Sequence, residues 1–419
     1  MKKSLLILLS VTLVYGLWSC EEEIFEDPLT TKKNIEVVWR TVVHPDSSTY
    51  ETLRYFFSDN YVVVGVPAVD PHEVPNGVMV LDRKTGKMKS SWTDHWDLIS
   101  SPPGLYLYDL WVGGPMNDYM VTNDGFRLCG YSVSSGNKLW DKLYSPFYAG
   151  RRISIVGNHA YVPITPVSPH SLTWFKLSRF DLITGQKEDL FTLEAEYENY
   201  KFFISPPTSY VTNNQDVLLI GLINHLNFDT FHGIVWTYCY NLTQRKMEWI
   251  RKDFTEDIEQ ALVIPTVVQD RIVVHLMRGV ACLDLETGAT HWIKDKIRIS
   301  LNLTDVLCED GRVYCKTDDG IVYCWDLLTG TELWKQDKYK FHSNERSNFQ
   351  IYQDKLLFNA YYEGRNHLIC LSTSTGKVLW IDDEILRNPM GRILIDKQKG
   401  YLYGSDYPDI FCIDLNKSN

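Results

Sequence analysis

The chain has 419 residues, of which 44% are hydrophobic and 13% are aromatic. This composition excludes a disordered chain, because it supplies enough apolar surface for a large core. The formal net charge of −11 argues against a nucleic-acid-binding protein, which would need a basic surface. The length alone suggests about three domains, but internal repeats would overturn that count.

The first 19 residues have the pattern of a secretory signal peptide. Lys2 and Lys3 form a basic start, and the apolar run that ends at Leu17 is too short to span a membrane. The segment Leu17-Trp18-Ser19-Cys20 resembles the lipobox of bacterial lipoproteins, although Trp18 is larger than the residue usual at its position. The resemblance implies that Cys20 carries the lipid. The alternative is an ordinary signal peptide with an incidental cysteine.

Residues 20–34 are predicted to form a polar tether between the membrane and a folded domain. Three glutamates, Glu21 to Glu23, directly follow Cys20. They resemble a surface-export signal of some bacterial lipoproteins, and a solvated linker would explain them equally well. The predicted division is therefore a signal peptide at 1–19, an acidic tether at 20–34 and a folded domain at 35–419.

A nine-residue pattern, Asp-x-x-Thr-Gly followed by a Trp at the ninth position, recurs along the rest of the chain. Its eight copies begin at intervals of 42 to 60 residues, at Asp82, Ser132, Asp181, Asn241, Asp284, Asp326, Ser372 and Asp414. In the copy at Asp82 the Trp, Trp92, comes two residues late. The copy at Asp181 lacks the Trp, the copy at Asn241 lacks the Thr-Gly, and the last copy ends with the chain. Repeats of this period indicate a solenoid, a propeller or an array.

The residues around each copy favour β-strands. An alternating or β-branched run precedes the pattern, Thr-Gly supplies a turn, and the run that contains the Trp returns as the partner strand. Further turn residues, such as Asp310-Gly311, precede another strand in each period. Each period then holds four antiparallel strands, which is the composition of a propeller blade.

This spacing resembles the repeat of the PQQ-like β-propeller family, within the quinoprotein alcohol dehydrogenase-like superfamily. The resemblance covers about residues 35–415 and implies an all-β, eight-bladed propeller. It also implies that the repeated tryptophans pack between neighbouring blades, at Trp92, Trp140, Trp249, Trp292, Trp334 and Trp380.

The last copy has no strand ending in Trp, but residues 35–40 supply one that includes Val37, Val38 and Trp39. We expect this N-terminal strand to join the C-terminal blade and close the ring, which removes an exposed sheet edge.

The remaining candidates for function lie in segments where the repeat is lengthened. These are Pro67–Gly77, Thr93–Ser101, Pro163–Phe175, Thr192–Ser205, Gly221–Gly233 and Asn359–His367. We expect them to form long loops on one face that bind a protein or glycan partner. The candidate partner-binding residues are Trp96, His170, Trp174, His225, Phe228, Phe231, His232, Tyr361 and Tyr362. In the alternative, these side chains pack on one another and cap the channel.

Nine cysteines first suggest disulfides. However, Cys239, Cys282, Cys324, Cys370 and Cys412 each lie two residues before a copy of the pattern, where a small buried residue is expected. Only Cys315 and Cys324 could face each other across a turn, and whether they are bridged stays open.

The sequence shows no catalytic signature. It has no Gly-x-Ser-x-Gly, no His-Glu-x-x-His, no phosphate-binding loop and no Cys-x-x-Cys-His. Quinoprotein enzymes of this fold bind PQQ with calcium and typically have an adjacent Cys pair, which is absent here. We therefore expect no catalytic residue, no cofactor and no metal site.

Together these features predict a non-catalytic, lipid-anchored scaffold in the outer membrane of a cell envelope. The repeat, the length and the anchor resemble the propeller lipoprotein of the outer-membrane barrel-assembly machinery, which implies a protein partner. Two alternatives stay open: a surface lipoprotein that binds a glycan or other ligand, and an atypical PQQ-dependent dehydrogenase. The sequence leaves open which side of the outer membrane the chain faces.

Overall fold

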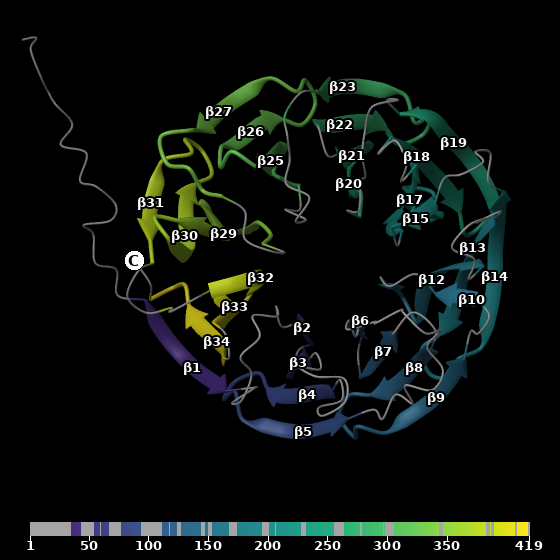
Figure 1. The fold of residues 1–419 in the computed structure, drawn as a ribbon, viewed down its shortest axis with the longest axis horizontal. Coiled ribbons are helices and arrows are strands. Elements are labelled where there is room, and N and C mark those ends of the chain that lie inside the picture. Colours follow the sequence, from purple (N-terminus) through teal and green to yellow (C-terminus); the bar gives the residue numbers. More distant parts are fainter. Residues whose placement is uncertain are drawn as a thin grey trace, which may run out of the picture.

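The computed structural model is a ring of eight antiparallel β-sheets, which we call blades 1 to 8 (Figure 1). The described residues are 35–42, 54–58, 60–66, 77–93, 111–116, 118–123, 127–143, 147–149, 153–166, 174–194, 201–205, 207–227, 232–254, 264–276, 279–295, 297, 306–342, 347–382, 386, 389–406 and 409–417. Within them, no helix is long and apolar enough to cross a membrane. The predicted eight-bladed, all-β propeller is confirmed.

The first half of the ring contains blades 1 to 4. Blade 1 is formed by β2 (Arg54–Phe57), β3 (Tyr61–Val66), β4 (Gly77–Asp82) and β5 (Met88–Thr93), and blade 2 by β6 (Trp111–Met116), β7 (Tyr119–Asn123), β8 (Arg127–Ser132) and β9 (Lys138–Leu143). Blade 3 is formed by β10 (Phe147–Ala149), β11 (Ser154–Val156), β12 (His159–Pro166), β13 (Trp174–Asp181) and β14 (Lys187–Glu194), and blade 4 by β15 (Lys201–Ile204), β16 (Thr208–Val211), β17 (Val217–Asn227), β18 (His232–Asn241) and β19 (Lys246–Phe254). In blades 3 and 4 the innermost strand is split into two pieces, so these sheets have five strands instead of the expected four.

The second half contains blades 5 to 8. Blade 5 is formed by β20 (Thr266–Val268), β21 (Arg271–Leu276), β22 (Gly279–Asp284) and β23 (Thr290–Lys294), and blade 6 by β24 (Leu307–Glu309), β25 (Arg312–Lys316), β26 (Val322–Asp326) and β27 (Glu332–Gln336). Blade 7 is formed by β28 (Gln350–Tyr352), β29 (Lys355–Tyr362), β30 (Arg365–Ser372) and β31 (Val378–Ile381), and blade 8 by β32 (Pro389–Asp396), β33 (Tyr401–Asp406), β34 (Asp409–Asp414) and β1 (Glu36–Val42).

The Asp and Thr of the repeat form the turn between the third and fourth strands of a blade. In blade 1, Asp82 Oδ1 accepts hydrogen bonds from the backbone N of Thr85 at 3.0 Å and from its hydroxyl at 2.9 Å. The copies at Asp181, Asp284 and Asp326 repeat this arrangement. These hydrogen bonds fix the turn locally, which explains why the sequence pattern is so regular.

The Trp and Gly of the repeat hold neighbouring blades together. The indole of Trp292 in blade 5 donates a 2.8 Å hydrogen bond to the carbonyl O of Leu327 in blade 6. Gly330 of blade 6 has a φ of +68°, and a Cβ added there would lie 2.8 Å from the ring of Trp292. The same indole-to-carbonyl hydrogen bond joins other blades, from Trp140 to Leu182, from Trp249 to Leu285 and from Trp334 to Thr373. Glycine is therefore required both for its conformation and for the close approach of the indole.

The hydrophobic core follows these contacts between blades. Eight clusters of buried side chains each combine residues of two adjacent blades, so every seam of the ring has a core of its own. Trp380 is buried in the seam between blades 7 and 8. The packing role expected for the repeated tryptophans is seen at Trp140, Trp249, Trp292, Trp334 and Trp380, whereas the side chain of Trp92 lies outside the described residues.

The two ends of the described chain meet in blade 8, where β1 pairs antiparallel with β34 (Figure 1). Val37 pairs with Ile413, and a bulge that contains Val38 precedes the pairing of Trp39 with Cys412. The Trp39 indole donates a 3.1 Å hydrogen bond to the carbonyl O of Arg83 in blade 1. The N-terminal strand thus supplies the missing tryptophan of the last repeat, as expected.

A buried ion pair lies beside this closing seam. The guanidinium of Arg83 pairs with Asp396 of blade 8, and both side chains are less than 10% exposed. Arg83 Nε also donates a 3.0 Å hydrogen bond to the hydroxyl of Tyr403. The seam that joins the chain ends therefore has polar as well as apolar contacts.

Blades 3 and 4 meet without the Trp-Gly contact. Asp189 occupies the Trp position of blade 3, and Arg245, with a φ of +56°, occupies the Gly position of blade 4. Arg245 pairs instead with Glu188 at 2.8 Å. The missing Trp of blade 3 and the missing Gly of blade 4 thus belong to one seam. Because no indole approaches there, the left-handed position can hold a residue with a side chain.

The cysteines of the described residues are all buried, and none of them forms a disulfide. Cys315 and Cys324 lie on paired strands, but Cys315 pairs with Tyr323 and Cys324 with Tyr314. This offset of one residue points the two side chains to opposite faces of the sheet, and they belong to different seam cores. No bridge joins them.

Candidate interaction site

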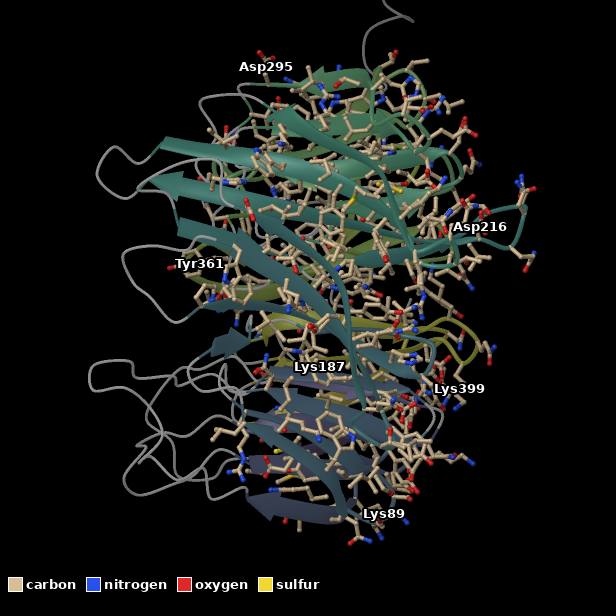
Figure 2. All side chains as sticks on the ribbon, turned by 90° about the vertical axis from the view of Figure 1, so that its right-hand side faces the viewer. Lys89, Lys187, Asp216, Asp295, Tyr361 and Lys399 are labelled. Carbon is tan, nitrogen blue, oxygen red and sulfur yellow. The ribbon has the colours of Figure 1, made fainter. Side chains whose placement is uncertain are left out.

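The two ends of the strands form different faces of the ring. We call the end with the Asp-x-x-Thr-Gly turns the turn face and the opposite end the loop face. Figure 2 shows Tyr361 on the loop face and Asp216 and Lys399 on the turn face. The lengthened segments were expected on the loop face, and two of them consist largely of strand: Gly221–Gly233 lies mostly within β17 and β18, and Asn359–His367 forms the hairpin of β29 and β30.

Several candidate residues lie in parts of the chain that the structure does not describe. Trp96, His170, Phe228 and Phe231, together with Cys20, lie outside the described residues. His232 begins β18, but its side chain is outside the described part. Trp174 is half-buried at the start of β13, and the ammonium of Lys176 lies 5.7 Å from the centre of its ring.

His225 does not lie on an exposed loop, so that expectation is wrong. It lies within β17 and is 0% exposed, with its ring centre 4.1 Å from that of Trp236. Burial, together with the charge of Lys252, lowers the pKa of His225 to about 3. A neutral, buried imidazole contributes to packing between strands and cannot contact a partner at the surface.

Tyr361 and Tyr362 lie at the end of β29 beside an ordered segment of the preceding link, Lys338–His342. The backbone N of His342 donates to the carbonyl O of Tyr361 at 3.0 Å, and the reverse hydrogen bond is 2.9 Å long. The backbone N of Phe341 donates to the carbonyl O of Gly320 at 3.0 Å. A Cβ at Gly320 would lie 2.7 Å from that nitrogen, so this glycine allows the segment to reach the blade.

Aromatic rings connect this surface to the core. Tyr339 lies 6.0 Å from Tyr362 and 6.0 Å from Phe341, measured between ring centres. Phe341 contacts Phe358 of blade 7 at 5.8 Å. Because Phe341 and Phe358 are fully buried, the tyrosines are held by a rigid base.

The outer part of this surface is polar and aromatic. Tyr361 is 44% exposed and points to the opposite side of the sheet from Tyr362. The Lys338 ammonium lies 4.9 Å above the ring of Tyr339, and His342 is exposed. We call Lys338, Tyr339, His342, Tyr361 and Tyr362 the Tyr361 patch. Tyr339 and Tyr362 on a rigid base, with the exposed Tyr361 and the Lys338 ammonium nearby, are suited to contact a protein or a sugar.

The sequence alone identified only the two tyrosines of β29. Lys338–His342 was missed because it follows a blade of ordinary spacing, where no added residues mark it. The alternation of Tyr339 and Phe341 with charged residues is the signal that could have revealed an ordered segment.

The described residues do not fit the calcium site that the quinoprotein resemblance implies. They contain no group of three or more His, Cys, Asp or Glu side chains that could hold a metal ion. A calcium ion of the kind that those enzymes hold would therefore find no such group of ligands among the described residues.

The ring, the repeat and the seams define an eight-bladed β-propeller whose repeat is similar to that of the PQQ-like family. Residues 235–383 match the family model described as outer membrane protein assembly factor BamB. This stretch runs from the end of blade 4 through blade 7 and includes the Tyr361 patch. A search of curated proteins found no match.

Solved structures share the fold. BamB from Moraxella catarrhalis is 14% identical, with a TM-score of 0.59 over 91% of this chain and 98% of that one. The computationally designed Ika8 protein is 12% identical, with a TM-score of 0.57 over 87% and 96% of the two chains. A europium-containing methanol dehydrogenase is 11% identical, with a TM-score of 0.60 over 88% and 84%. An assembly factor, a designed protein and a methanol dehydrogenase thus have this architecture, so the fold alone does not decide the activity.

Proposed function

We propose that this protein is a non-catalytic, lipid-anchored scaffold of the cell envelope that binds a component of outer-membrane protein assembly through its loop face. The observation that carries the proposal is the match of residues 235–383 to the BamB family model, which includes the rigid Tyr361 patch. The likeness to BamB from Moraxella catarrhalis over almost the whole length of both chains supports the same role.

Site-specific photo-crosslinking in intact cells tests the docking role. A photo-reactive residue at Tyr361 is compared with one at Leu328, which is 55% exposed and lies in the motif turn of blade 6. The proposal predicts that position 361 crosslinks to outer-membrane assembly components and that position 328 does not. Equal crosslinking at both positions, or none to such components from either, would contradict it.

The lipid anchor has a test of its own. Incorporation of labelled palmitate should depend on Cys20 and disappear in the Cys20→Ser variant, which should also leave the membrane fraction. A Cys20→Ser variant that stays labelled and membrane-bound would show that another residue anchors the chain.

The second candidate function is glycan binding at the same patch. Tyr361 is exposed and Tyr339 and Tyr362 are half-buried, so their rings could stack against sugar rings. A glycan array with the wild type and the Tyr361→Ala variant separates the two functions. A glycan signal that is lost in the variant, without any protein crosslink, favours the second.

A further inference from the structure

A pocket of about 590 Å³ lies on the turn face, in the seam between blades 4 and 5. Its residues come from the β16–β17 turn and the β18–β19 turn of blade 4, from the adjoining ends of these strands and from the matching turns of blade 5. Asp216, which lines the pocket, lies on the opposite side of the ring from Tyr361 (Figure 2). The pocket is therefore separate from the proposed docking site.

Local departures from the repeat create this pocket. The turn before β17 has five residues, Thr212 to Asp216, whereas Gln269-Asp270 makes the matching turn of blade 5 with two. The backbone N of Thr212 donates to the carbonyl O of Asp216 at 2.9 Å, which closes the longer turn. The neighbouring turn begins at Asn241 and lacks the Thr-Gly of the other copies.

Amide side chains fix the acidic wall of the pocket. Gln244 Nε2 donates to Asp216 Oδ2 at 2.7 Å. Asn241, which is 2% exposed, donates from Nδ2 to Glu248 Oε1 at 2.9 Å and to Asp216 Oδ2 at 3.3 Å. The carboxylates of Asp216 and Glu248 are thus held in place beside each other.

The lining combines an apolar floor with an excess of negative charge. Leu218, Cys239 and Leu285 form the floor and are each less than 9% exposed. Five of the lining residues are acidic and none is Lys or Arg: Asp216, Glu248, Asp270, Asp284 and Glu286.

Neighbouring cations offset only part of this charge. Lys246 lies 3.2 Å from Glu248, and Arg271 lies 2.8 Å from Asp270. His291 lies 3.5 Å from Asp284 and adds charge only when protonated. With neutral histidine, five carboxylates and two cations leave a net charge of −3 around the pocket.

We propose that this pocket binds a lysine or arginine side chain of a basic peptide segment in a protein partner. The aliphatic part of such a side chain would lie on the floor of Leu218 and Leu285, and its cationic head would meet the fixed carboxylates. The volume is within the range of ligand sites. A neutral sugar would leave the excess negative charge of the lining uncompensated. The protein would then bind partners on both faces of the ring.

Calorimetric titration of the full chain with a tetra-arginine peptide at 0.15 M salt tests this site. The double variant Asp216→Asn/Glu286→Gln removes two carboxylates of the pocket. The expected result is about tenfold weaker binding, which is the equivalent of about 1.4 kcal/mol. A tetraglutamate peptide should not bind.

The matched control is Asp310→Asn/Glu332→Gln, which removes two carboxylates from the neighbouring blade 6. Binding should be unchanged in this control. An equal loss in both variants would mean that the peptide responds only to the total negative charge, and it would overturn the proposal. Absence of binding to the wild type, or tighter binding of spermine than of the peptide, would also overturn it.

Discussion

The Trp-Gly contact at the closing seam can be tested with one methyl group. Gly86 of blade 1 has a φ of +67°, and a Cβ there would lie 2.5 Å from Cε3 of Trp39, which comes from the N-terminal strand. Gly311 has nearly the same φ of +71° with nothing within 4 Å of the added atom. Gly86→Ala and Gly311→Ala therefore have similar backbone strain and differ in the collision with the indole.

The strain of a left-handed residue costs about 1–2 kcal/mol in both variants. Displacement of the tightly packed indole adds about 1–3 kcal/mol for Gly86→Ala alone. Urea unfolding followed by circular dichroism should therefore show that Gly86→Ala is the less stable variant by about 1–3 kcal/mol.

A double-mutant cycle with Trp39→Ala identifies the cause of this difference. Trp39→Ala alone should cost about 3–5 kcal/mol, because it removes a buried indole. In the Trp39→Ala background, Gly86→Ala should cost no more than Gly311→Ala, since the collision has gone. Equal costs for the two glycines in the wild type, or additive costs in the cycle, would refute the closure of the ring by Trp39.

Three further predictions concern buried and paired charges. Burial lowers the pKa of Lys316 to about 7, so the folded state disfavours the protonated side chain. The free energy of unfolding should therefore rise between about pH 7 and 10.5. In urea titrations, Lys316→Met should abolish that rise and gain up to about 5 kcal/mol below about pH 7. Arg83→Met should cost up to about 3–5 kcal/mol in the same assay, because it leaves the buried Asp396 carboxylate with only the longer 3.7 Å ion pair to Lys399. A neutral effect would contradict the role of the Arg83–Asp396 pair. Although burial opposes the shift, hydrogen bonds from Lys176 and other side chains lower the pKa of Asp189 to about 2. Its contribution to stability should therefore be present above about pH 4 and lost towards about pH 2. An Asp189→Asn variant whose acid transition matches that of the wild type would contradict this.

The architecture could be predicted because the repeat specifies it locally. Asp82 and Thr85 form the turn by hydrogen bonds within four residues, so the same residue types produce the same turn in other blades. The missing strand of the last blade could be found because most other blades end in a strand with Trp, and residues around Trp39 supply one. These inferences need only the period of the pattern and the need to avoid an open sheet edge.

Features that depend on three-dimensional neighbours were harder to predict. An added residue can extend a strand or form a loop, and the sequence of β17 does not show that His225 is buried beneath Trp236. Similarly, no local signal shows that Lys338–His342 forms a bridge to Tyr361 in the next blade. The acidic pocket was missed because its carboxylates come from strand β19 and from three separate turns that only the ring brings together.

Amide hydrogen exchange along β34 tests the closed ring most directly. An outer strand such as β27 has one neighbouring strand, so alternate amides lack a partner in the sheet and should exchange fast. β34 lies between β33 and β1, and the closed ring predicts slow exchange at every amide from Ile410 to Asp414. Fast exchange at alternate amides of β34, as in β27, would show that β1 is not paired there and would contradict the closed eight-bladed ring.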